Sequence, residues 1–173
     1  MSLSDDTINP NLSRLTRLRV EEFLAIRVWM DLMEICGELQ SGEFSVNTYS
    51  STDRDALDND IIRVHSTLQE MSLHTVYDGL SAAAVLAYFQ FPSLKNLRIS
   101  AEDEIDPTPP PPSIFESFAS IRSLSIDRSW KSQAPYMVNL FRETINLEKL
   151  VIDYCPRSFS RVFEAMTLGS GLH

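Results

Sequence analysis

The sequence predicts an α/β solenoid, in which one strand and one helix per repeat stack on their neighbours. Three observations in the 173 residues predict it. A short apolar phrase, L-x-x-L-x-L, recurs along the chain, and its copies are 26 or 27 residues apart. The stretches between several copies have helical periodicity. We therefore expect about six repeats in a single domain, residues 1–173, whose strands form a parallel sheet on the concave face.

The phrase is clearest in the C-terminal half of the chain. Its central apolar residues there are Leu97, Leu124 and Leu150. Counting back by the same interval places weaker copies around Leu18, Phe44 and Met71. A period of this length with this phrase is typical of leucine-rich repeats, in which each repeat contributes one strand to a shared sheet.

Helices are expected between the strand phrases. Residues 21–35 have apolar side chains at helical spacing and give the longest helical signal. Residues 56–64 and 80–89 predict the next two helices, and Pro92 ends the second of these before the following strand. Shorter helices are expected at residues 114–118, 135–143 and 158–166.

The fourth repeat contains an insertion, residues 101–112. It is an acidic stretch that runs into four consecutive prolines. Because proline has a fixed φ and no backbone N–H, this segment is expected to form an extended polyproline loop rather than a helix. The insertion is therefore expected to lie on the surface, between the fourth strand and the short helix that follows.

Composition and charge narrow the function classes. With a net charge of −9, the chain is not expected to bind nucleic acid, because that binding depends on Lys and Arg neutralising phosphates. No apolar run reaches the roughly 18–20 residues that cross a bilayer, and the polar N-terminus lacks a secretory signal. We therefore expect an intracellular protein, cytoplasmic or nuclear, with no membrane contact.

The two cysteines are expected to be free thiols. Cys36 lies before the second strand phrase and Cys155 after the sixth, so four strand spacings put them on the order of 20 Å apart. A disulfide needs Cα atoms within about 7 Å of each other. The predicted spacing therefore excludes a bond between them.

No catalytic constellation is recognisable. The sequence has no phosphate-binding glycine loop, no G-x-S-x-G phrase and no H-E-x-x-H phrase. His65, on a predicted helix, and His74, after a predicted strand, have no cysteine or carboxylate at metal-ligand spacing. We therefore expect no enzyme activity, no cofactor, no metal and no small-molecule substrate. The aromatic residues of the predicted helices, among them Phe23, Trp29 and Phe89, are expected in the core.

The strand phrases also resemble those of a known family. Residues 91–99 and 118–126 resemble the P-S-L-x-x-L-x-L phrases of F-box/leucine-rich-repeat proteins from mushroom-forming fungi. Residues 32–46 are similar to another of their phrases, with Gly37 where proline is usual. The resemblance implies a repeat region that holds the substrate of a ubiquitin ligase. The F-box of that family docks on a Skp-type adaptor, but the stretch before Leu15 is too short for an F-box, so contact with the adaptor is not expected.

The sheet face that points away from the helices is the predicted binding surface. Strand side chains alternate, so the residues that flank each central apolar residue point outward. The predicted partner-binding residues are polar, and they are Arg17, Arg19, Glu43, Glu70, Asn96, Arg98, Ser123 and Lys149. They predict a non-catalytic module that binds a protein partner. The alternative is a structural scaffold, or a truncated repeat fragment, with no dedicated partner.

Overall fold

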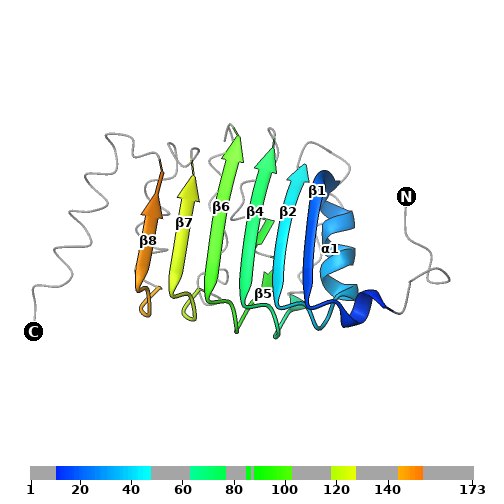
Figure 1. Cartoon of the computed structure of the whole chain (residues 1–173), viewed down its shortest axis with the longest axis horizontal. Coiled ribbons are helices and arrows are strands. Elements are labelled where there is room, and N and C mark those ends of the chain that lie inside the picture. The colour runs from blue at the N-terminus through cyan, green and yellow to red at the C-terminus, as the bar shows by residue number, and fades with distance from the viewer. Residues whose placement is uncertain are drawn as a thin grey trace, which may run out of the picture.

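Six parallel strands form the main sheet of the protein (Figure 1). The computed structural model describes residues 11–47, 63–76, 85–86, 88–102, 118–127 and 144–153. In spatial order the strands are β1 (Arg17–Ala25), β2 (Ser41–Asn47), β4 (Glu70–Val76), β6 (Asn96–Glu102), β7 (Ser123–Asp127) and β8 (Lys149–Ile152). Because every neighbouring pair is parallel, the chain returns to the same edge of the sheet before each new strand. The prediction of an α/β chain with a parallel sheet in a solenoid-like arrangement is confirmed.

Within the described residues, a 3-10 helix, an α-helix and two short strands accompany the main sheet. A short 3-10 helix, η2 (Leu12–Arg14), precedes β1, and the helix α1 (Ile26–Ile35) lies at the β1 end of the sheet (Figure 1). Two short strands, β3 (Arg63–Val64) and β5 (Phe89–Gln90), pair in parallel as a second, smaller sheet. Phe89 is buried in the same core as the inner side chains of the main sheet, so the small sheet packs on the inner face.

The core lies against one face of the main sheet, because strand side chains alternate between its two faces. The inward-pointing pairs on the four central strands are all buried: Phe44 and Val46, Met71 and Leu73, Leu97 and Ile99, Leu124 and Ile126. Four aromatic rings join this layer to α1 and β5. Trp29 meets Phe44 and Phe89 edge-on, with ring centroids 6.4 and 5.4 Å apart, and Phe89 stacks on Phe91 at 5.7 Å.

A tight turn precedes most strands of the main sheet. In it, the backbone N–H of the first apolar residue of the phrase donates to the carbonyl three residues earlier, as Leu94 does to Phe91 at 3.1 Å and Ile121 to Phe118 at 3.1 Å. In three of the repeats, the polar residue just before that apolar residue bonds to a carbonyl of the previous repeat; these residues are Thr67, Ser120 and Asn146. Ser120 Oγ, for example, donates to the Leu94 carbonyl at 2.8 Å. This bond gives a physical reason for a serine at position 120.

A second contact repeats beside these turns and fixes the strand register. The Gln69 carbonyl accepts two N–H groups of the next strand segment, those of Lys95 at 2.8 Å and Asn96 at 3.0 Å. The Lys95 carbonyl accepts the N–H groups of Arg122 and Ser123 in the same way, at 2.8 and 2.9 Å. The paired bonds therefore align the strands from the amino edge of the sheet, the edge at which the strands begin.

The predicted helix over residues 21–35 is wrong at its beginning, because β1 continues to Ala25 and α1 begins at Ile26. Arg19 pairs with Glu43 and Phe23 pairs with Ser45, so β1 has two surplus residues at this point. Both Val20 and Leu24 pack against the core. Their spacing of four residues matches the periodicity of a helix, but it results from the two surplus residues in β1.

The second strand phrase has its centre two residues earlier than predicted. Gly42, not Phe44, pairs with Leu18 and Met71, so it lies 24 residues after the first centre and 29 before the third. A Cβ atom at Gly42 would lie 2.4 Å from Cε2 of Phe44. The Phe44 ring thus occupies the volume that the central side chain fills in the other strands, and glycine is required beside it.

Other predictions are wrong at the ends of elements. Arg63 and Val64 form β3, so they do not end a helix, and Phe89 is in β5 rather than in a helix, although it is buried as expected. β6 extends to Glu102, so the insertion begins later than residue 101. Most of the proline-rich insertion, Cys155, and the predicted helices at 135–143 and 158–166 lie outside the described residues. So do residues 114–117 of the predicted helix at 114–118, whose last residue, Phe118, lies in the turn before β7. The number of complete strand-helix repeats therefore stays a prediction.

Candidate binding face

The outward side chains of the main sheet form two rows across its six strands. The first row, in register order, is Arg17, Ser41, Glu70, Asn96, Ser123 and Lys149. The second row is Arg19, Glu43, Ser72, Arg98, Ser125 and Val151. The structure therefore brings all the predicted partner-binding residues onto one face. Ser41, which the sequence pattern did not single out, belongs to the first row because the centre of β2 is Gly42.

Several polar contacts cross the strands within these rows. The Glu70 carboxylate accepts hydrogen bonds from Asn96 Nδ2 at 3.1 Å and from Ser41 Oγ at 3.5 Å. Arg19 Nε lies 3.5 Å from Glu43 Oε2. Ion pairs between exposed groups stabilise a fold by about 0–1 kcal/mol. These contacts therefore orient the side chains of the face more than they stabilise the sheet.

Three cations of the face have no acidic partner within the described part of the chain. Arg17, Arg98 and Lys149 make no ion pair or side-chain hydrogen bond with any described residue. All three are exposed. They are thus available to an external anionic group, at both ends of the sheet and in its middle.

A shallow depression of about 230 Å³ lies in the middle of this face. Five of the predicted residues are part of its lining: Glu43, Glu70, Asn96, Arg98 and Ser123. The remainder of the lining is made by Ser41, Ser72 and Ser125, together with Gly42, Met71 and Leu97. The small side chain of Ser72, between Glu43 and Arg98 in the second row, therefore leaves a hollow with charged groups of both signs in its lining.

An exposed aromatic ring lies beside the polar rows. Phe23, expected in the core, is 59% exposed, and its ring centroid is 6.5 Å from that of His74. His74 lies inside β4 rather than after a strand, and its Nδ1 is 2.5 Å from Ser100 Oγ of β6. The sequence pattern does not predict an exposed apolar group here, because Phe23 fits the helical periodicity of residues 21–35.

His65 is a structural residue of the interior. It is 4% exposed, follows β3, and its Nε2 donates to the Cys36 carbonyl at 3.1 Å. Cys36 is a free, buried thiol, as expected, and burial raises its pKa, which disfavours the reactive thiolate. Within the described ranges, no group of three or more His, Cys, Asp and Glu side chains could hold a metal ion.

Stability is expected to fall with acidification through His65. Burial lowers the pKa of His65 from its ordinary 6.5, and the hydrogen bond to the Cys36 carbonyl opposes this only partly. The unfolded chain therefore binds this proton at a higher pH than the folded chain does. Between the two pKa values the unfolded state holds more protons, so the free energy of unfolding decreases as the pH falls below about 6.5.

Urea unfolding at about pH 7.5 and about pH 5.5 measures this effect. The matched variant is His65→Gln, whose amide N–H can still donate to the Cys36 carbonyl but does not titrate. The native protein should lose more stability than this variant across the interval. Equal losses would mean that another group controls the acid response.

Comparison with protein-family models, with curated proteins and with solved structures gave no match. Among the described residues, no helix has the length and apolar character needed to span a bilayer.

Proposed function

We propose that this protein is a non-catalytic protein-binding module of the leucine-rich-repeat type, and that its binding surface is the outward face of the main sheet. The observation that carries the proposal is the pair of polar rows, with Arg17, Arg98 and Lys149 unpaired among the described residues. The described helix and the small sheet pack on the other face. Extended solenoid sheets commonly use such a surface for partners.

The assignment to leucine-rich repeats is supported by the strand phrase. Its apolar residues are buried on one face of a parallel sheet, and the same turn recurs before successive strands. The register at Leu97, Leu124 and Leu150 is continuous across β6, β7 and β8. These features are what one strand per repeat in a stacked array requires.

A protein is the partner class that fits the chemistry of the face. The surface carries both signs of charge, with Glu43 and Glu70 close to Arg98, which disfavours a polyanion such as nucleic acid. Arginine and aromatic residues dominate the binding energy of protein interfaces, and the face offers Arg98 near its centre and Phe23 at its rim.

A narrower form of the proposal follows from the resemblance of the strand phrases to F-box/leucine-rich-repeat proteins. In that form the face holds the substrate of an F-box-like ubiquitin ligase. It is supported by the resemblance of residues 32–46, 91–99 and 118–126 to phrases of that family. A Skp-type adaptor and a cullin should then be recovered with the intact protein from cells of its source, and the absence of both would rule out the ligase role.

Reversing the charge of two unpaired cations should weaken partner binding strongly. In Arg17→Glu/Arg98→Glu, each new carboxylate would face the partner's acidic groups, and like charges at an interface cost several kcal/mol. We expect partner recovery to fall by about ten-fold or more. Quantitative affinity purification of the native chain and the variant measures it. Arg19 is left unchanged because it pairs with Glu43.

The matched control is Arg14→Glu/Arg27→Glu. Both residues are exposed, Arg14 in η2 and Arg27 in α1, so this variant has the same change of charge outside the two rows. It should recover the partner as the native chain does. Equal recovery with both double variants would exclude the sheet face as the binding site.

A further inference from the structure

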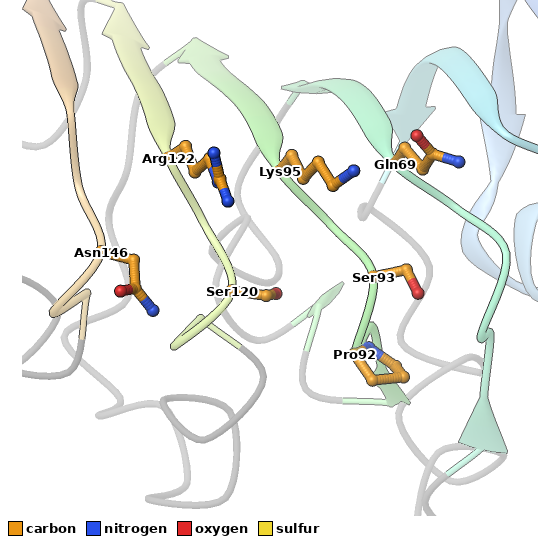
Figure 2. Close-up of a pocket in the computed structure, with 7 residues that line it drawn as sticks. All are labelled: Gln69, Pro92, Ser93, Lys95, Ser120, Arg122 and Asn146. Atoms are coloured by element: carbon orange, nitrogen blue, oxygen red, sulfur yellow. The ribbon is translucent and has the colours of Figure 1, made fainter.

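A pocket of about 390 Å³ lies at the amino edge of the main sheet, below the polar rows. It is lined by Gln69, Pro92, Ser93, Lys95, Ser120, Arg122 and Asn146 (Figure 2). Its volume is within the range of about 300–1,000 Å³ that is usual for ligand sites. The sequence pattern does not predict these residues as part of a site, because they do not flank the central apolar residue of a strand phrase.

Two cations lie next to each other in this pocket. The Arg122 N–H bonds to the Lys95 carbonyl at 2.8 Å, so the two residues are neighbours in the strand register, and Figure 2 shows both side chains in one row with Gln69. Neighbouring strands of a sheet lie about 4.8 Å apart, so like charges at the same level of two adjacent strands repel each other. A bound anion between them would relieve that repulsion.

Only one of these two cations has a carboxylate partner among the described residues. The described residues of its lining include no Asp or Glu, although the chain has a net charge of −9. Arg122 Nη1 reaches Glu148 Oε1 outside the lining at 3.4 Å, and both side chains are well exposed. Lys95 makes no ion pair with a described residue. The pocket therefore keeps a local positive charge in an acidic protein.

The other polar side chains of the pocket are of two kinds: two are held in place by hydrogen bonds to backbone carbonyls, and two can donate to a ligand. Ser120 Oγ–H and an N–H of Asn146 are held by the Leu94 and Ala119 carbonyls, both at 2.8 Å. The Ser93 hydroxyl and the Gln69 amide make no side-chain hydrogen bond with a described residue. Two cations and two neutral donors thus face one space, an arrangement that suits the oxygens of a carboxylate or phosphate.

We propose that the amino-edge pocket binds an oxyanion, a carboxylate or a phosphate, carried by a segment of the partner protein. The choice of a protein as the carrier rests on the proposed function. Asn96 and Ser123 of the first polar row directly follow Lys95 and Arg122 in the chain. A segment that lies on the sheet face therefore places an acidic side chain over the edge and into the pocket.

The test uses the full chain, labelled with ¹⁵N, and three blocked peptides that differ at two positions. One peptide carries two glutamates, one carries two phosphoserines and one carries two glutamines. The glutamate or the phosphoserine peptide should shift the amide signals of the pocket in a saturable way, and the glutamine peptide should not. The comparison of the first two peptides shows which oxyanion the pocket prefers.

Lys95→Gln/Arg122→Gln should weaken that binding by about 100-fold, because each charge-assisted contact is worth about a factor of ten. Arg14→Gln/Arg27→Gln, with the same change of net charge away from the pocket, should bind the peptide within about two-fold of the native chain. Equal weakening in both variants, or equal binding of all three peptides, would overturn the proposal.

The proposal for the pocket and the proposal for the sheet face can be contradicted independently of each other. One outcome is that the anionic peptides need Lys95 and Arg122, while partner recovery does not depend on Arg17 and Arg98. Oxyanion binding by the pocket would then be supported, and the proposed binding face would be wrong. If partner recovery depends on Arg98 but no anionic peptide binds, the pocket proposal is wrong and the binding face stands.

Discussion

Replacing Trp29 with alanine is expected to lower the free energy of unfolding by about 3–5 kcal/mol, the usual range for removing a buried tryptophan. Trp29 is fully buried, and its ring meets Phe44 of β2 and Phe89 of β5 edge-on. It therefore joins α1, the main sheet and the small sheet. Urea unfolding followed by circular dichroism measures the loss.

The matched variant is Trp29→Phe, which keeps an aromatic ring against Phe44 and Phe89. The Nε1 atom of Trp29 is buried without a hydrogen-bond partner in the described part of the protein. Leaving such a donor unpaired costs about 1–3 kcal/mol, so its removal offsets part of the lost packing. Trp29→Phe should therefore destabilise the protein much less than Trp29→Ala. Equal destabilisation would show that the larger indole ring alone supports this junction.

The second large effect is expected at Gly42. In Gly42→Leu, the new side chain meets the Phe44 ring, which is itself buried against Trp29 and cannot move away. Overpacking of a core costs typically about 1–3 kcal/mol, and we expect the upper end of this range because even Cβ is too close. Thermal and urea unfolding both report the change.

The double variant Gly42→Leu/Phe44→Ile should recover most of that stability. It restores the usual L-x-x-L-x-I phrase, with the central side chain at 42 and a smaller one at 44. Phe44→Ile alone leaves a space over Gly42 and should also be destabilised. The two substitutions should therefore be strongly non-additive. Additive losses would contradict the view that the Phe44 ring substitutes for the missing central side chain.

The sequence pattern predicts the C-terminal strands better than the N-terminal ones, and the reason is physical. Around Leu97, Leu124 and Leu150 the phrase is regular, and the predicted register is the observed one. At Phe44 the prediction is two residues out of register. Side chains alternate with a period of two, so a shift of two residues keeps every side chain on the same face. Alternation along one strand cannot detect such a shift, which only the pairing with neighbouring strands reveals.

The same property explains why the face is predicted correctly where the register is wrong. Glu43 points outward whether the centre of β2 is at 42 or 44. The amino-edge pocket is a different case, because Lys95 and Arg122 precede the alternating part of their strands. Their placement depends on the turns that bring several strands to one edge. The column of Gln69, Lys95 and Arg122, each directly before a predicted outward residue, is the signal that could have found it.

The two surplus residues in β1 have a consequence for how this fold can change in length. Inserting or deleting a pair of residues within a strand moves the hydrogen-bond partners but leaves the apolar side chains inside. A single inserted residue ahead of Arg98 would turn that guanidinium into the core and expose Ile99. Insertions and deletions in these strands should therefore be tolerated in even numbers, and loop segments should absorb the odd ones.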